Sequence, residues 1–133
     1  MLEIAANRYT QIRNTTSTQG ELLLALYDGL FRFLNGAKVA LEKKDLRVAR
    51  ELLSRAYAIT SELYIALDHD VSPELCQQLE GVYGFAMDRM MFASRKGLVK
   101  PLEEAIRVLT PLREAWQVAV PQAHRELAAA AKR

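Results

Sequence analysis

Apolar residues recur every three or four positions along most of this chain, which is the spacing of a helix with one buried face. Four long segments show this spacing, at about residues 18–44, 46–68, 73–97 and 98–120, and none shows the alternation typical of a strand. The predicted core positions are Leu23, Leu26, Leu30, Leu34, Ala37 and Leu41; Ala49, Leu52, Ala56, Thr60, Leu63 and Leu67; Leu75, Leu79, Val82, Ala86 and Met90; and Leu102, Ala105, Leu109, Leu112 and Trp116.

Residues typical of helix ends flank these segments. They are a Thr18–Glu21 capping box, an N-cap at Asp45, Ser72 followed by Pro73, and a terminating Gly97. Within the fourth segment, Pro111 removes a backbone hydrogen bond and predicts a kink, and Pro121 predicts an end or a second bend. The last residues then form a short terminal helix or fray.

The connections between the four segments are short, which forces consecutive helices to lie antiparallel. The sequence therefore predicts an all-α fold, an up-down-up-down four-helix bundle. We divide the chain into an N-terminal arm at residues 1–17, the bundle at 18–120 and a C-terminal tail at 121–133.

Composition narrows the function without identifying it. The 133 residues suit one domain, half of them are hydrophobic, and the net charge is only +2. So small a charge gives no general footprint for nucleic acid. No secretory signal and no apolar run long enough to cross a bilayer are present, so we expect a soluble, cytoplasmic protein without membrane insertion.

Residues for catalysis or metal binding are sparse. His69 and His124 are the only histidines and form no ligand motif, and Cys76 has no histidine near it in sequence. The run Asp68-His69-Asp70 is more typical of a solvated loop than of a cation site. We expect no enzyme activity, no cofactor and no metal, which leaves a binding module.

Several helices carry more apolar residues than one buried stripe requires. The additional positions are Leu24, Tyr27 and Phe31; Leu53, Tyr57 and Tyr64; and Cys76, Tyr83, Met87 and Met91. Each residue taken alone suits a wide core face. The whole set favours a recognition surface, because four helices cannot all bury two stripes in one interior. Tyrosine and methionine are also typical of such surfaces, and an exposed apolar groove commonly receives an amphipathic helix.

The segment before Thr18 is polar and shows no clear period, apart from Tyr9 and Ile12, which are three residues apart. These two side chains could hold the arm against the bundle. A disordered tail is an equally good interpretation.

Four runs of this sequence resemble the flagellar secretion chaperone family, FliS. They are ELLLALYDGLFRFL at 21–34, A-x-ELL-x-x-A at 49–56, L-x-x-VYGFAMDRM at 79–90 and L-x-x-L-x-x-AW at 109–116. They occur in the order and spacing of that family, and the resemblance covers about residues 9–119. The first run is the most specific of the four.

The resemblance implies a bundle that binds the disordered C-terminal segment of flagellin in surface grooves and prevents premature polymerisation. It places Tyr9 at the position of an arm tyrosine that contributes to binding or covers the empty site, with Ile12 at an apolar position after it. Together with the surplus apolar positions, this predicts the following flagellin-binding residues: Tyr9, Ile12, Leu24, Tyr27, Phe31, Leu53, Tyr57, Tyr64, Tyr83, Met87 and Met91. Other flagellar export components are further candidate partners, and the expected state is a monomer or weak homodimer.

This sequence departs from the family pattern in places. Thr18-Gln19 replaces the usual Ser-Pro before the first helix, Asn14 stands at a commonly apolar position, and Pro101 and Pro111 are unexpected in the last helix. The alternative hypothesis from another class is a structural oligomerisation module, whose surplus stripe is buried against a second copy.

Overall fold

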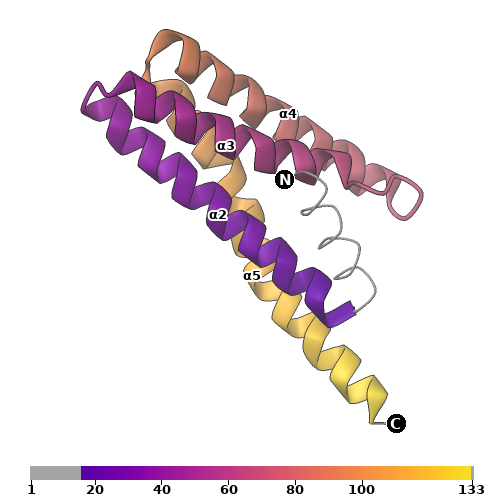
Figure 1. Cartoon of the computed structure of the whole chain (residues 1–133). Helices are drawn as coiled ribbons and strands as arrows, with labels where there is room; N and C mark the ends of the chain where they lie inside the picture. Colours follow the sequence, from indigo (N-terminus) through magenta and orange to yellow (C-terminus); the bar gives the residue numbers. More distant parts are fainter. Residues whose placement is uncertain (1–15, 133) are drawn as a thin grey trace. The chain divides into compact units, whose positions relative to one another are not determined.

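A computed structural model describes residues 16–132 of the chain. Four α-helices make up almost all of this part, and no β-strand occurs within it. They are α2 (Thr16–Glu42), α3 (Leu46–Ile65), α4 (Pro73–Lys96) and α5 (Val99–Ala131), as Figure 1 shows. The predicted all-α fold with four helices is confirmed.

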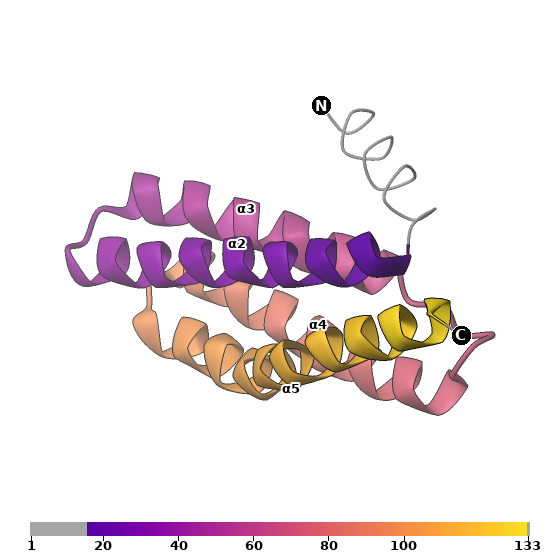
Figure 2. The same ribbon diagram turned by 90° about the horizontal axis from the view of Figure 1, so that it is seen from below.

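Residues Asp28–Pro111 form one compact unit that contains parts of all four helices. Short connections make consecutive helices antiparallel, and within this unit α2 and α3 run side by side in both views (Figures 1 and 2). Contacts join α2 to α3 (Gly36 and Leu52), α4 to α5 (Arg89 and Glu104, 3.9 Å) and α5 to α2 (Lys38 and Glu103, 4.0 Å). The helices of this unit therefore surround one interior in chain order.

Small side chains line much of that interior on α3 and α4. They are Ala49, Ala56 and Thr60 on α3, with Ala86 and Ala93 on α4, and all are buried. The Thr60 hydroxyl donates to the carbonyl oxygen of Ala56 at 2.9 Å, so its burial leaves no unmet donor. Because interiors are close-packed, larger side chains must fill the space that these residues leave. Phe31, Leu53 and Tyr83 are among the larger side chains that are buried.

Two tight turns close one end of this unit. After α2, Lys44 adopts the left-handed conformation (φ 60°), and the amide of Asp45 donates to the carbonyl of Ala40 at 2.8 Å. After α4, Gly97 adopts the same conformation (φ 66°), as predicted for a helix terminator. A Cβ on Gly97 would lie 2.9 Å from Leu46 Cδ2, the end of a side chain that can move, so it is the left-handed backbone that favours glycine there.

Residues 16–27 of α2 and 112–132 of α5 belong to the second compact unit. Gly20 allows a close approach of the two helices in this unit. A Cβ at that position would lie 2.5 Å from Val120 Cγ1, closer than two carbon atoms can pack. The sequence "QGE" at the start of the apolar segment thus has a steric reason.

Predicted boundaries at two places are wrong. The described helix already includes Thr16, so Thr18 lies inside α2 and is not its N-cap. α5 does not end at Pro121, and no separate terminal helix follows. Pro111 also lies within α5, and the kink predicted there stays a prediction. Both prolines are exposed, so water can bond the carbonyl that each one leaves without a partner. Pro101 lies in the first turn, where no intrahelical donor is needed.

Other boundary predictions are confirmed. Asp45 is the N-cap of α3, and its carboxylate accepts from the amide of Val48 at 3.4 Å. Ser72 precedes Pro73 at the start of α4 but makes no capping hydrogen bond with its side chain among the described residues. The division of the chain into arm, bundle and tail stays a prediction.

Candidate functional site

A hollow of about 310 Å³ lies between α3 and α4 in the unit Asp28–Pro111. We call it the α3–α4 groove. Its lining residues are Arg50, Leu53, Ser54 and Tyr57 from α3 and Met90, Met91 and Ser94 from α4. Leu53 and Met90 are buried and form its base, whereas Tyr57 and Met91 are accessible at its sides. The groove is thus apolar at its base and walls.

Polar groups lie at the rim of the groove. Arg50 Nε donates to the carbonyl oxygen of Ser94 at 3.0 Å and so connects the two helices. Ser54 is exposed one turn further along α3. An apolar base with a few polar groups at the rim is the general form of a site that receives an apolar partner.

Exposed apolar side chains extend this surface along both helices. Tyr64 follows Tyr57 by seven residues on α3 and is exposed to a similar degree, 38% against 36%. On α4, Gly84 and Met87 precede Met91 by seven and four residues and therefore share its side of the helix. A Cβ on Gly84 would have no neighbour within 4 Å. The surface beside the groove is therefore open as well as apolar.

Four of the predicted binding residues belong to the interior. Tyr27 and Tyr83 are 0% and 2% exposed, and Phe31 and Leu53 are also buried. Their expected exposure on a second stripe was wrong, because a close-packed interior that contains many alanines also needs large side chains to fill it. Only Leu53 among these four lines the groove, at its base.

The other predicted site residues have different locations. Tyr57, Tyr64 and Met91 are exposed, and Leu24 and Met87 are half-buried. Tyr9 and Ile12 lie outside the described residues. The structure brings Leu53, Tyr57 and Met91 together in one groove. A flagellin-binding role for any residue of the set stays a prediction.

A second hollow, of about 500 Å³, lies between α4 and α5 in the same unit, and the sequence analysis missed it. It is lined by Phe85, Lys100, Glu103, Glu104, Arg107 and Val108. Phe85 is 44% exposed, and the guanidinium carbon of Arg89 lies 5.8 Å from the centroid of the Phe85 ring. In the sequence, only the position of Phe85 off the main apolar stripe of its helix could have indicated this hollow. The charged residues of α5 follow no pattern that would have predicted it.

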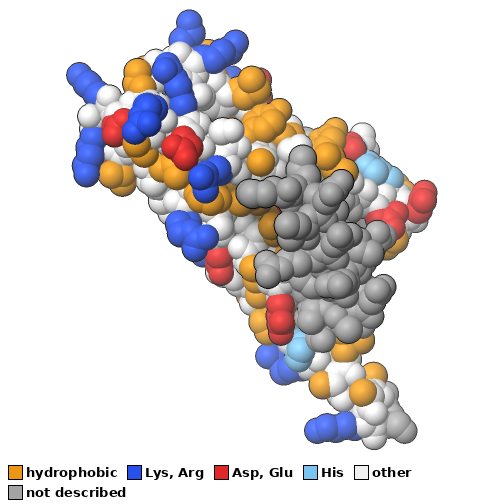
Figure 3. All heavy atoms as spheres, viewed as in Figure 1, with side chains coloured by type: hydrophobic (Ala, Val, Ile, Leu, Met, Phe, Trp, Pro, Cys, Tyr) orange, Lys and Arg blue, Asp and Glu red, His pale blue; other side chains and the backbone are white. Residues whose placement is uncertain are grey.

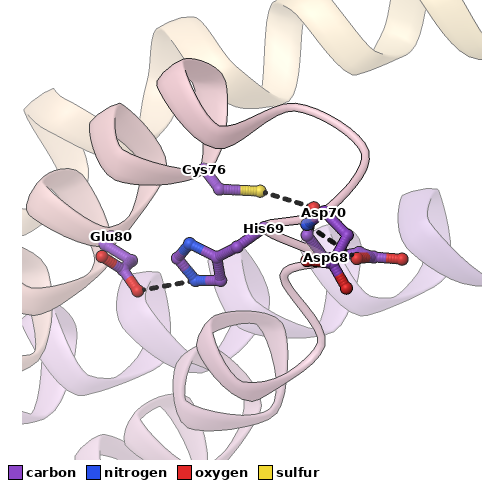
Figure 4. A network of polar contacts seen from close by, with 5 residues as sticks. All are labelled: Asp68, His69, Asp70, Cys76 and Glu80. Atoms are coloured by element: carbon purple, nitrogen blue, oxygen red, sulfur yellow. Dashed lines mark hydrogen bonds and ion pairs between the residues drawn. The ribbon is translucent and has the colours of Figure 1, made fainter.

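Polar contacts tie the loop between α3 and α4 to the start of α4, as Figure 4 shows. His69 Nε2 lies 2.8 Å from a carboxylate oxygen of Glu80, and the Asp70 amide donates to the Asp68 carboxylate at 3.1 Å. The thiol of Cys76 donates to the carbonyl of Asp68 at 3.2 Å. Cys76 is buried.

The described part of the chain contains no group of three or more His, Cys, Asp or Glu side chains that could hold a metal ion. In the same part, none of the helices has both the length and the apolar character needed to span a membrane. The candidate sites are therefore the two surface hollows described above. Apolar side chains make up more of the lining of the α3–α4 groove than of the hollow between α4 and α5.

Known proteins resemble this chain along most of its length. A family model described as "Flagellar protein FliS" matches residues 1–123. The flagellar secretion chaperone FliS of Bacillus subtilis strain 168 is 32% identical over 112 residues, which cover 84% of this chain and 83% of that protein. The protein of the same name from Campylobacter jejuni strain 81116 is 30% identical over 114 residues, 86% of this chain and 89% of that one. The Salmonella typhimurium LT2 protein is 29% identical over 104 residues, 77% of each.

Proposed function

This chain belongs to the FliS family of flagellar proteins and has a chaperone role in flagellar export, and we propose that its client is the C-terminal segment of flagellin. The α3–α4 groove is the proposed docking site. Binding there needs no chemical step, so the proposed chaperone is not an enzyme. We expect it to act in the cytoplasm, before the client is exported.

One observation supports the groove above the other predicted positions. Tyr57 and Met91 line it from two helices and remain 36% and 50% exposed. Apolar side chains that are positioned by the fold but not yet covered gain the most from a docked partner. A groove between two helices is suited to an amphipathic helix, whose anchors recur every three or four residues.

The properties expected of the client match this surface. A disordered segment that folds on binding loses about 2–5 kcal/mol of the gross interaction energy to ordering, so it needs an extended contact. The line from Met91 through Met87 to Gly84, with Tyr57 and Tyr64 opposite, supplies one along both helices. The arm residues Tyr9 and Ile12 stay predicted contributors.

Calorimetry with a flagellin C-terminal peptide tests this function. We expect binding at micromolar concentration or tighter, and Tyr57→Ala and Met91→Ala should each weaken it by more than about 1 kcal/mol, roughly fivefold. Phe85→Ala is the matched control, because Phe85 is an exposed apolar residue on the α5 side of α4. It should leave the affinity unchanged.

Two results would contradict the proposal in different ways. No binding by the wild-type protein would reject flagellin as the client. An equal loss in the Phe85→Ala variant would reject the groove but not the client. Light scattering of the free protein separates a monomer or weak homodimer from an obligate oligomer, and an obligate oligomer that ignores the peptide would favour a structural module.

A further inference from the structure

The small net charge of this protein conceals a strong separation of charge. Residues 56–87 contain five acidic residues, Glu62, Asp68, Asp70, Glu74 and Glu80, and no lysine or arginine. At the opposite end of the same unit, the two tight turns carry six cations, and we call these residues the basic end: Lys43, Lys44, Arg47, Arg95, Lys96 and Lys100. Figure 3 shows many blue side chains at this end, with acidic side chains among them, and red side chains without blue neighbours at the end of the α3–α4 loop.

The six cations form one surface because the two turns are adjacent. Leu46, between Lys44 and Arg47, lies against Gly97 of the other turn. All six residues are exposed, and no ion pair joins any of them to a carboxylate of a described residue. Asp45 is the only acidic residue in the segments 43–47 and 95–100, and Glu42 and Glu103 lie just outside them. Six cations against these three carboxylates leave the basic end with a net positive charge.

Local structure accounts for only half of these cations. Lys43, Arg95 and Lys96 lie at or just beyond helix C-termini, where the helix dipole favours positive charge. Arg47 and Lys100 are the second residues of α3 and α5, where the same dipole disfavours it, and neither helix has an acidic residue in its first turn.

Lys44 is also placed against local preference. It has φ 60°, a conformation that glycine adopts without cost and that lysine adopts only against steric strain. The equivalent turn after α4 has glycine at this place, Gly97. Lys44, Arg47 and Lys100 are thus unfavourable for the local backbone conformation or the helix dipole. This indicates that their positive charges serve the binding of an anion outside the protein.

The form of the basic end indicates the kind of anion. Its cations come from four helix ends, and only Lys100 lines either hollow of the unit, so they do not converge on a pocket. Leu46 and Leu98 stand among them and are 37% and 48% exposed. Lysine and arginine clustered around exposed apolar side chains are typical of proteins that rest on anionic membrane surfaces.

We propose that the basic end docks on the surface of an anionic phospholipid bilayer. Lys43, Lys44, Arg47, Arg95, Lys96 and Lys100 contact the headgroups, and Leu46 and Leu98 enter the headgroup layer. The acidic residues of the other end are repelled by the same surface and so orient the unit end-on. This binding is peripheral and independent of the α3–α4 groove.

Co-sedimentation with lipid vesicles tests the proposal. The full-length protein should bind vesicles of phosphatidylcholine and phosphatidylglycerol, should not bind phosphatidylcholine alone, and should lose binding as salt rises. Each removed cation should weaken binding roughly fivefold. Arg47→Gln with Lys100→Gln is the first variant, because the helix dipoles predict that it folds at least as well as the wild type.

A second variant separates binding from folding. Lys44→Gly should raise the midpoint of urea unfolding, since it relieves the left-handed lysine, and should lower vesicle binding. The matched control is Arg125→Gln with Lys132→Gln, which removes two cations outside the basic end. It should bind vesicles like the wild type. All these variants should bind the flagellin peptide normally, which keeps this test distinct from that of the groove.

Several outcomes would overturn the proposal. Equal binding to phosphatidylcholine alone would show that charge does not drive the contact. If the control variant and Arg47→Gln with Lys100→Gln lost vesicle binding equally, net charge alone would explain the binding, and the basic end would have no special role. Binding to polyglutamate without binding to anionic vesicles would assign the basic end to an acidic protein segment instead.

Discussion

The interior and the α3–α4 groove use the same residue type in opposite ways. Tyr83 on α4 is 2% exposed and fills the interior, whereas Tyr57 on α3 is 36% exposed at the side of the groove. Tyr83 shares its face with Leu79, Ala86 and Met90, which are all buried. Tyr57 follows the buried Ala56 by one residue and so lies about 100° further round its helix. The position of a tyrosine round an amphipathic helix therefore decides whether its ring is buried in the interior or stays accessible at the surface.

The largest expected effect is on the interior side of this comparison. Tyr83→Ala should lower the free energy of unfolding by about 3–5 kcal/mol, because a buried ring is lost and the close-packed interior cannot fully collapse around the cavity. Urea denaturation followed by circular dichroism measures it. Tyr83→Phe keeps the ring and should lose much less. A small loss for Tyr83→Ala would mean that its burial contributes little and would remove the contrast with Tyr57.

A change on the groove side should affect binding more than folding. Gly84→Leu places a side chain in open space beside Met87 and Met91, where we expect the client helix to lie, and should weaken flagellin-peptide binding by more than about 1 kcal/mol. Gly81→Leu is the matched control, since a Cβ there also has no neighbour within 4 Å. Gly81 lies about 80° round α4 from Met91, whereas Gly84 lies only about 20° from it, and Gly81 is the more exposed of the two.

Both leucine variants should be at least as stable as the wild type, because leucine has a higher helix propensity than glycine. Calorimetry and urea denaturation on the two proteins separate the readouts. If Gly81→Leu weakens the peptide as much as Gly84→Leu, the client does not follow the line from Met91 to Gly84.

The smallest expected effect completes the comparison. Tyr57→Ala should change the free energy of unfolding by no more than about 0.5 kcal/mol, since an exposed side chain leaves no cavity. Urea denaturation beside Tyr83→Ala tests this difference directly. A loss approaching that of Tyr83→Ala would place Tyr57 in the core in energetic terms and would leave Met91 as the main accessible apolar residue of the groove.

The helical spacing of apolar residues identified most of the buried residues but not the exact side of each helix that faces the interior. On α2 the predicted stripe included Leu23 and Leu26, which are half-buried, and excluded Phe31, which is buried. Adjacent positions on a helix differ by 100°, so a wide apolar face offers more than one centre. The small buried residues Ala49, Ala56 and Thr60 belong to another helix, and only the packing of the helices shows which positions on α2 are left for large side chains.

The candidate site was predicted in composition and less well in place. Tyr57 and Met91 were both expected to be accessible, and the structure places them at one groove. No local pattern could pair them, because they are 34 positions apart and meet only when α3 and α4 pack (91 − 57 = 34). The same holds for the basic end, which joins segments on either side of α3 and α4.

The sequence by itself determined the helices, their antiparallel order and the family, because these depend on local spacing, helix-end residues and short connections. It also determined that charge separates along the chain. Tertiary structure decided which apolar stripe turns inward, which tyrosines remain accessible and which charged turns lie together. Those choices depend on the volumes of side chains contributed by other helices, and no single segment contains that information.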